Sequence, residues 1–204
     1  MLKRLQAGVT LIELMIGLAI IGFLLFLGVP EFANFLQNTQ IRNAAETTLA
    51  GLTLARAEAV RRNASVRFQL VSDLGSGCTV STAPLNDSAS LSWVVSLADP
   101  VGACDQAPSE TTAPRIVQKK SAKEGSANVR VSTDAAPTVV FNGLGRVTGA
   151  VLQRLDFKNA SGICVHIDDV NGTMRCLSIM VTSGGQVKMC DPKVGDTADP
   201  RHCS

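Results

Sequence analysis

Hydrophobic positions form one long run near the start of the chain. From Val9 to Val29 the only charged side chain is that of Glu13. As a helix this run is roughly 31 Å long at ~1.5 Å per residue, which matches the ~30 Å hydrocarbon core of a bilayer. The run therefore predicts one transmembrane helix. Lys3 and Arg4 precede it, so the N-terminus is expected in the cytoplasm and the rest of the chain outside.

Apolar residues beyond Pro30 recur at spacings of three and four, which is typical of an amphipathic helix ending near Arg62. We expect this helix to continue the apolar run and to bend near Pro30. Its apolar stripe is expected to pack on a globular head, and a coiled-coil partner is the alternative. The stripe consists of Phe32, Phe35, Leu36, Ile41, Ala45, Leu49, Leu52, Ala55 and Ala59. Charged residues occupy the remaining surface: Arg42, Glu46, Arg56, Glu58, Arg61 and Arg62.

After Asn63 the period changes to two, which predicts short strands separated by turns. The candidate strands are Ser65–Val71, Leu91–Leu97, Ala127–Ser132, Thr138–Asn142, Val151–Lys158, Ile163–Ile167, Met174–Val181 and Gln186–Cys190. Long loops are expected at Ser72–Ser90 and Asp99–Pro114, and Arg115–Lys123 is expected to begin a third. The predicted fold is α+β, with a long N-terminal helix packed on an antiparallel β-sheet head.

Composition and charge narrow the classes of function. The 204 residues fit one domain with an appendage. The chain has nineteen Lys and Arg and seventeen Asp and Glu, which argues against a globally basic nucleic-acid binder and leaves a local basic patch open. One Trp and no Tyr argue against an aromatic platform for single strands.

Six cysteines in an exported part of the chain predict disulfides, because that compartment is oxidising. Six cysteines allow 15 pairings. The favoured pairs are Cys78–Cys104, Cys164–Cys176 and Cys190–Cys203. Cys78 and Cys104 lie on either side of the expected strand that contains Trp93. Cys164 and Cys176 can face each other across a hairpin centred on Val170. The pair Cys190–Cys203 closes a loop of about 14 residues, worth about 3 kcal/mol in the loop-entropy account. Cys176–Cys190 stays open as an alternative, since these residues also flank a turn.

Metal and catalytic motifs are absent from the sequence. Five residues have zinc-ligand chemistry but no matching spacing: Cys164, His166, Cys190, His202 and Cys203. The turn Asp168–Gly172 and the tail residues Asp191, Asp196 and Asp199 lack the EF-hand pattern, which favours turn chemistry over calcium. No nucleophile elbow, P-loop or zinc-protease motif occurs. We expect no metal, no cofactor and no enzymatic activity.

The first fourteen residues, MLKRLQAG followed by VTLIEL, resemble the class III signal of type IV pilins and type II secretion pseudopilins. The resemblance implies that a prepilin peptidase removes a leader, residues 1–8, by cutting after Gly8. It also implies N-methylation of Val9 and an assembly role for Glu13. Gly22 and Pro30 fall where pilin stems commonly carry them. Val9 departs from the commoner Phe or Met.

Glu13 has a physical reason to favour assembly. A carboxylate inside an apolar helix costs about 2.5–3.5 kcal/mol on insertion scales. Cleavage after Gly8 creates an amine with an ordinary pKa near ~7.7–8.0, which can neutralise Glu13 of a staggered neighbour. Breaking such a pair in an apolar setting costs on the order of 3–5 kcal/mol. The alternative is a local bond in the first turn of its own helix, where the helix dipole favours a carboxylate.

The head resembles the GspH/FimT group of minor pilins and pseudopilins. The helix end and first strand, Ala45–Phe68, carry an A-R-x-E-A-x-x-R-N pattern with Arg56, Glu58, Ala59, Arg62 and Asn63. The segment Val139–Val147 resembles the strand–turn–strand with a G-x-G-R turn, and SGGQVKMCDP with DPRHC resembles the C-terminal end. The loops at 72–125 hardly share the resemblance.

The resemblance implies a minor pilin that primes a type IV pilus and lies at or near its tip with other minor and major pilins, serving twitching motility and adhesion. A GspH-type pseudopilin of type II secretion is the alternative. The chain would be an inner-membrane protein with one span (9–29), an amphipathic half-helix (30–63) and a periplasmic head (64–204). A DNA-binding competence pilin is a third reading, with contacts at Lys188, Lys119 and Lys120. Gly185–Lys188 lacks the G-R-x-R pattern of such proteins, so we expect weak binding.

Overall fold

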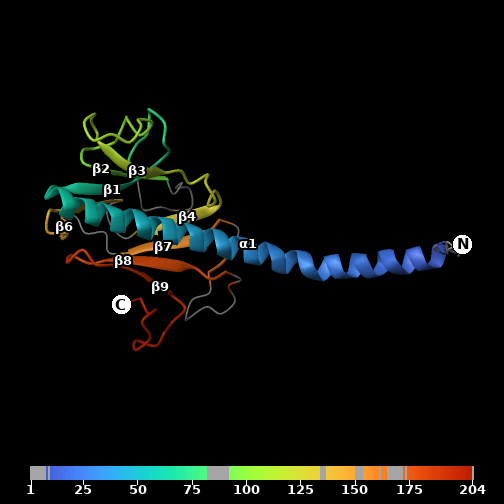
Figure 1. Ribbon diagram of the computed structural model, residues 1–204. Coiled ribbons are helices and arrows are strands. Elements are labelled where there is room, and N and C mark those ends of the chain that lie inside the picture. Colours follow the sequence, from blue (N-terminus) through green and yellow to red (C-terminus); the bar gives the residue numbers. More distant parts are fainter. Residues whose placement is uncertain are drawn as a thin grey trace, which may run out of the picture. The chain divides into compact units, whose positions relative to one another are not determined.

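A computed structural model of the chain describes residues 8, 10–81, 92–133, 137–149, 154–160, 162–164, 172 and 174–203, without the side chains of 27–31. Two compact units are present, Met1–Leu36 and Gln37–Ser204, and each is described by itself. Helix α1, Leu11–Arg62, has residues in both units (Figure 1). The predicted helix ending at Arg62 is therefore confirmed, and its assignment includes Pro30.

The second unit contains two antiparallel sheets. Sheet A has the strand order β3-β2-β1-β5-β6, and sheet B has the order β4-β7-β8-β9. Sheet A consists of β1 (Val66–Val71), β2 (Ser92–Ser96), β3 (Ile116–Lys120), β5 (Thr138–Phe141) and β6 (Val147–Thr148). Sheet B consists of β4 (Val129–Thr133), β7 (Arg154–Asn159), β8 (Leu177–Val181) and β9 (Val187–Cys190). The predicted α+β class, a helix packed on antiparallel sheets, is confirmed.

One core joins the helix to both sheets. The buried face of α1 carries Ile41, Ala44, Ala45, Thr48, Leu52, Ala55 and Ala59, at spacings of three and four. It packs against Phe68 of sheet A and Phe157 of sheet B, among others. The predicted stripe from Ile41 onward is thus the face that packs on the head, whereas Phe32, Phe35 and Leu36 of the same stripe are 45–64% exposed. Leu49 of that stripe is only partly buried, and Thr48 takes a fully buried place.

Strand β2 is buried along its whole length, because both of its faces are covered. Trp93 and Val95 belong to the core under the helix. Val94 belongs to a second cluster, which Val71, Ile116 and the disulfide Cys78–Cys104 complete. The loops on this side therefore cover the outer face of sheet A and are tied to it by a covalent bridge.

Two strands were missing from those that the alternating pattern predicts, although the resemblance at Val139–Val147 implies the second of them. The expectation that Arg115–Lys123 begins a loop is wrong, because Ile116–Lys120 forms the edge strand β3 and pairs with β2. The polar residues in IVQKK suit an edge strand, where most side chains are only half-buried. The short strand β6 follows the Asn142–Arg146 turn and pairs with β5.

The Cys164 region also differs from expectation. Cys164 forms an isolated parallel bridge with Met174, whereas a simple hairpin would align these residues antiparallel. Strand β8 begins at Leu177 and not at Met174. Most of the expected strand Ile163–Ile167, with the turn at Val170, lies outside the described residues.

Candidate functional site

The first turn of α1 is capped by Thr10. Its hydroxyl accepts the N–H of Glu13 at 3.3 Å, and its carbonyl accepts the N–H of Leu14 at 3.2 Å. This is the backbone half of a capping box, with Glu13 at the third helical position. Gly8 and Glu13 are both exposed, and Val9 lies outside the described residues. The local bond of Glu13 is thus made by its backbone, and its carboxylate has no partner among the described residues.

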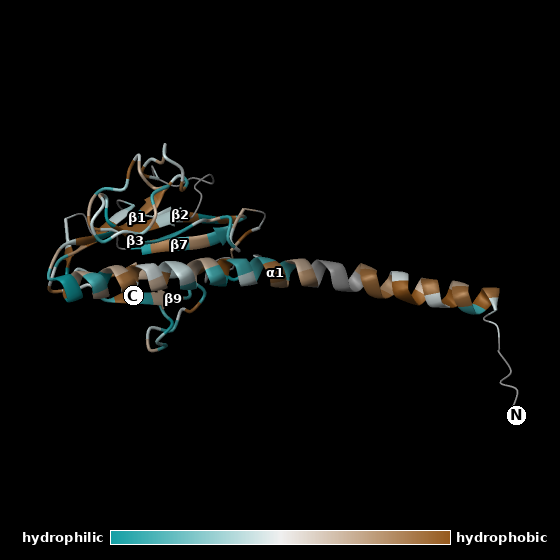
Figure 2. Ribbon diagram, turned by 45° about the horizontal axis from the view of Figure 1, so that its top comes forward, coloured by the Kyte–Doolittle hydropathy of each residue, from teal (hydrophilic) through white to brown (hydrophobic). Residues whose placement is uncertain are grey.

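The segment that follows carries large apolar side chains that the first unit does not bury. From Leu11 to Phe26 these side chains are 54–78% exposed. Figure 2 shows this part of α1 as almost continuously hydrophobic, while polar and apolar residues alternate further along. Within the part of the chain that the structure describes, no helix combines the length and hydropathy that a membrane crossing requires.

The second candidate region is the C-terminal end of α1. Asn63 adopts a left-handed conformation with φ 47°. The N–H of Ala64 bonds to the carbonyl of Ala59 at 3.1 Å, and the N–H of Asn63 bonds to that of Val60 at 3.2 Å. These two bonds make a Schellman cap, in which an Asn is tolerated at the left-handed position. The R-N end of the sequence pattern thus stops the helix and turns the chain into β1.

Two glycine turns pack on this helix end. The carbonyl of Gly145 accepts a hydrogen bond from Nε of Arg56 at 3.2 Å. A side chain at Gly185 would place its Cβ 1.8 Å from the same carbonyl oxygen, so only glycine fits there. A Cβ at Gly143 would likewise lie only 2.5 Å from Oδ1 of Asn63. The N–H of Val147 also bonds to the carbonyl of Ser183. The three sequence patterns of the head therefore meet at one place, and their contacts are structural.

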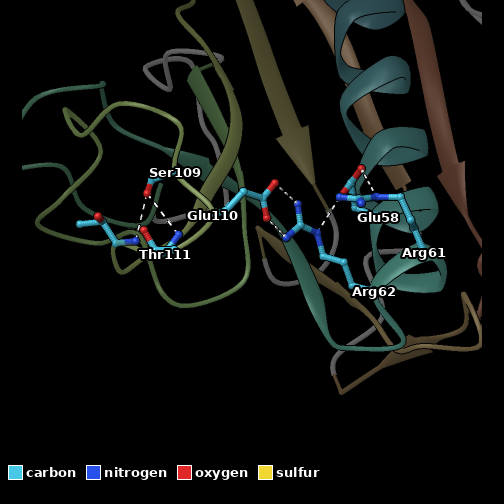
Figure 3. A network of polar contacts seen from close by, with 7 residues as sticks. Glu58, Arg61, Arg62, Ser109, Glu110 and Thr111 are labelled. Carbon is cyan, nitrogen blue, oxygen red and sulfur yellow. Dashed lines mark hydrogen bonds and ion pairs between the residues drawn. The ribbon is translucent and has the colours of Figure 1, made fainter.

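Charged residues of the same helix end form a network with a distant loop (Figure 3). Glu58 accepts bonds from Arg61 at 2.7 Å and from Nε of Arg62 at 2.6 Å. Arg62 also binds Glu110 with two nitrogens, one of them at 2.7 Å. The side chains of Glu58 and Arg62 are only 15% and 16% exposed, contrary to the expected surface positions.

This network also favours the charged forms of its members. Hydrogen bonds from Arg61, and then from Arg62, hold the pKa of Glu58 below its ordinary value. A hydrogen bond from Arg62 lowers the pKa of Glu110, and that of Arg62 is raised chiefly by Glu110. Ser109, next to Glu110, accepts the N–H groups of Thr111 and Thr112 and so shapes the loop. The network pins the loop before β3 to the helix end.

Lys119 and Lys120, two of the candidate DNA contacts, are engaged within the head. The ammonium of Lys119 donates to the carbonyls of Cys104, Asp105 and Gln106, each at 2.8 Å. Lys120 forms an ion pair with Glu124. Lys119 thus holds the loop that follows the disulfide of Cys104, and all three of its N–H donors are used within the head.

Lys188, the third candidate, is half-buried on β9, the edge strand of sheet B. Strand β3, with Lys119 and Lys120, is the edge strand of sheet A. Figure 1 shows β3 and β9 at opposite ends of the two sheets. The structure therefore does not gather the three candidate lysines into one patch.

Three disulfides are present: Cys78–Cys104, Cys164–Cys176 and Cys190–Cys203, with Cα–Cα distances of 6.1, 5.4 and 5.1 Å. Cys176 and Cys190, the alternative pair, belong to different bridges. Among the described residues there is no cluster of three or more metal-ligating side chains. His166, Asp168 and Asp169 lie outside the described residues.

Comparisons with protein families agree with these two regions. A model of the prokaryotic N-terminal methylation motif matches residues 3–29. A model described as type II transport protein GspH matches residues 44–185, more than half of the chain. The chain belongs to the GspH family. In this GspH-family chain, the residues matched by the GspH model include the C-terminal end of α1, both glycine turns and most of the two sheets.

Comparisons with individual proteins add similarity but no closer assignment. Two crystal forms of the type IV minor pilin FimU of Pseudomonas aeruginosa resemble the GspH-family chain. One is 16% identical, with a TM-score of 0.43 over 76% of this chain and 91% of that chain. The other is 17% identical, with a TM-score of 0.38 over 72% and 90%. A search of curated proteins gives no significant match.

Sequence reasoning missed Glu110 as the partner of Arg62. The two residues are 48 positions apart, in a loop with no periodic pattern and hardly any resemblance to the family. It also missed Asp191 as a buried charge, with a side chain 4% exposed that pairs with Arg175. The one available signal for a further partner was the Glu58–Arg62 part of the helix-end pattern. A single carboxylate does not use all five N–H donors of Arg62, so a second acceptor was to be expected.

Proposed function

We propose that this GspH-family protein is a minor pilin that primes assembly of a type IV pilus and lies at or near its tip. The observation that carries the proposal is the joint presence of two parts. One is the methylation motif with an exposed apolar helix from Leu11 to Phe26. The other is a separate, disulfide-linked head that matches the GspH model. The role is structural and requires no catalytic group.

The apolar run Val9–Val29 would hold the protein in the inner membrane as a single span, with the head in the periplasm. Water does not favour large apolar side chains at this density, so they need lipid or the stems of other subunits around them. Both environments are apolar. Transfer from membrane to fibre therefore changes the neighbours of the helix without exposing it to water.

Glu13 would make this transfer selective. Thr10 already caps the first turn through the backbone of Glu13, which leaves the carboxylate for a second partner. After cleavage behind Gly8, the methylated amine of Val9 in a neighbouring subunit has the charge to pair with it. In lipid the unpaired carboxylate is costly, whereas in the fibre it is neutralised. Other pilins are therefore the partners, and the prepilin peptidase is the processing enzyme.

The first test is the N-terminal mass of the membrane-extracted protein. We expect residues 1–8 to be absent and Val9 to carry a methyl group. The second test compares Glu13→Ala with Glu46→Ala, which removes an exposed carboxylate of the same helix outside the apolar run. Glu13→Ala should be cleaved normally but be scarce in sheared fibres, whereas Glu46→Ala should enter them like wild type. An intact Met1, or equal incorporation of both variants, contradicts the proposal.

The second candidate is a pseudopilin of a type II secretion system, because the matching family is described as a type II transport protein. The same membrane helix and the same pairing of Glu13 serve both machines. Deletion of the gene separates the two. Loss of surface pili and twitching with normal protein secretion supports the pilus, and the reverse result supports the secretion system.

A further inference from the structure

A groove of about 460 Å³ lies between α1 and the C-terminal loop of the head. Asn38 contributes from the helix, Met174 and Arg175 from the segment before β8, and Lys193 and Arg201 from the loop after β9. Asp191 and Val194 complete the lining. Three cations line it with one carboxylate, that of Asp191, which is almost fully buried and pairs with Arg175; Arg201 pairs with Asp199, outside the lining. The groove is therefore cationic at its rim and partly apolar inside.

Arg175 is held in place by that buried carboxylate. Its Nε donates to Oδ2 of Asp191 at 2.7 Å, its Nη2 lies 2.5 Å from the same oxygen as an ion pair, and its own N–H bonds to Asn38 at 2.9 Å. The side chain of Arg175 nevertheless remains 49% exposed. Asp191 also accepts the N–H of Lys193 at 3.0 Å. The bonds to Asp191 leave Nη1 of Arg175 as a donor for a second acceptor, in a fixed orientation.

Two further cations stand on the loop. Arg201 binds Asp199 through Nε at 3.1 Å and Nη2 at 2.7 Å and is 62% exposed. The ammonium of Lys193 is exposed and has no partner in the described part of the chain. The other loop carboxylates do not line the groove: Asp196 accepts the N–H of Ala198, and Asp199 accepts that of Arg201. A second acceptor at the rim would thus meet donors from three side chains.

The walls of the groove are covalently braced. Cys176, two residues after Met174, is bridged to Cys164, and Cys190, next to Asp191, is bridged to Cys203. The backbone of Asp191 also bonds to the carbonyl of Arg201 at 2.8 Å and to the N–H of Val194 at 3.0 Å. A site built in this way loses little conformational freedom when it binds a ligand.

We propose that this groove binds an acidic segment of another protein subunit. Its carboxylates would pair with Lys193, Arg201 and the free donors of Arg175, and an adjacent aliphatic side chain would contact Met174 and Val194. Charge complementarity sets the sign of the partner. The apolar lining favours a polypeptide over a bare phosphate, which has no apolar part. That the partner is a neighbouring fibre subunit rests on the proposed function.

The binding test uses the full chain in zwitterionic detergent and a fluorescein-labelled octapeptide with four Glu and two Leu, followed by anisotropy. Its twin has Gln in place of each Glu. Wild type should bind the Glu peptide and not the Gln peptide. The double variant Lys193→Gln, Arg201→Gln should bind about tenfold more weakly, because two charge pairs are lost. Lys193→Gln alone should have a smaller effect in the same direction.

Lys123→Gln is the matched control, since it removes an exposed cation of the head outside the groove. It should bind like wild type. Equal binding by the double variant, equal binding of the Gln peptide, or no binding by wild type overturns the proposal. Tighter binding to phosphatidylglycerol vesicles than to the peptide, with the same dependence on Lys193 and Arg201, also overturns it and assigns the groove to a lipid headgroup.

A second measurement separates this proposal from the proposed function. In cells the double variant should still be cleaved after Gly8 but be depleted from sheared fibres, whereas Lys123→Gln should not be. If the double variant loses peptide binding yet enters fibres normally, the partner is not a fibre subunit. Failure of wild type to be processed or assembled would contradict the pilin role and leave the peptide result standing.

Discussion

The two ends of α1 use apolar residues in opposite ways. From Leu11 to Phe26 the large apolar side chains are exposed. From Ile41 to Ala59 one face is buried, and it consists mostly of small residues. Small side chains let two sheets approach the helix closely, whereas large ones on every side suit an environment outside the folded chain. Apolar content therefore does not tell which part of a helix belongs to its own head.

Truncation of one leucine in each segment should give the largest difference in stability between the two segments. Leu52→Ala removes a fully buried side chain and should lower the free energy of unfolding of the head by about 2–5 kcal/mol. Leu24→Ala, at a position 61% exposed, should leave it unchanged. Trp93, the only Trp, is buried in the head and reports its unfolding by fluorescence in denaturant. Equal effects of the two variants would contradict the difference in burial between the two segments.

Substitution of one glycine in each segment should show the same difference with a smaller effect on stability. A Cβ at Gly51 would lie 3.0 Å from the rings of Phe68 and Trp93, so Gly51→Val should destabilise the head by about 1–3 kcal/mol through overpacking. Gly22 has open space around it, so Gly22→Val should not change head unfolding. The measurement is again Trp93 fluorescence. A stable Gly51→Val variant would contradict the close packing of helix and sheet.

The network around Arg62 should make a modest, pH-dependent contribution to the stability of the head. The pKa values of Glu58 and Glu110 are lowered in the folded state, so the stabilisation is present above their ordinary value of ~4.3 and is lost as pH falls through the lowered values. Glu110→Gln should lower the melting midpoint at pH 7 by at most about 2–4 °C. The difference from wild type should shrink below pH ~4.

Glu46→Gln is the control for this experiment. Glu46 is exposed, and its ion pair with Arg42 is long, at 3.9 Å. We expect no measurable change in the midpoint at either pH, because such pairs contribute little. A difference between Glu110→Gln and wild type that persists unchanged in acid would show that the loop is held by something other than charge.

The smallest effect is expected when Lys188 is replaced and DNA binding is measured. Lys188 stands apart from Lys119 and Lys120, which are engaged within the head. Gel shifts at low salt should show weak binding to duplex DNA that disappears near ~200 mM salt, because phosphate contacts release counterions. Lys188→Ala should change it little, and Lys123→Ala serves as the control. Tight binding at ~200 mM salt that Lys188→Ala abolishes would make DNA uptake the leading function.

Much of the architecture was predictable, because it rests on local patterns. The period of three and four gave the helix to Arg62, and the period of two gave most strands, since each element shows its own side-chain spacing. Strand β3 was not predicted, because an edge strand needs few apolar residues. Its identity depends on pairing with β2, whose paired residues lie 20 to 27 positions earlier in the chain. The parallel Cys164–Met174 bridge was not predicted because the turn residues Asp168–Gly172 favour an antiparallel hairpin.

The sequence by itself determined the apolar run, the methylation motif with Gly8 and Glu13, and the glycines and Asn63 at the helix end, because each depends on neighbours close in the chain. Only the tertiary structure decided that the three head patterns meet at one helix end, that Arg62 binds Glu110 and Lys119 holds a loop, and that Arg175, Lys193 and Arg201 surround one groove. These depend on contacts between distant segments. Such contacts form only when two sheets close over one helix, and no local period records them.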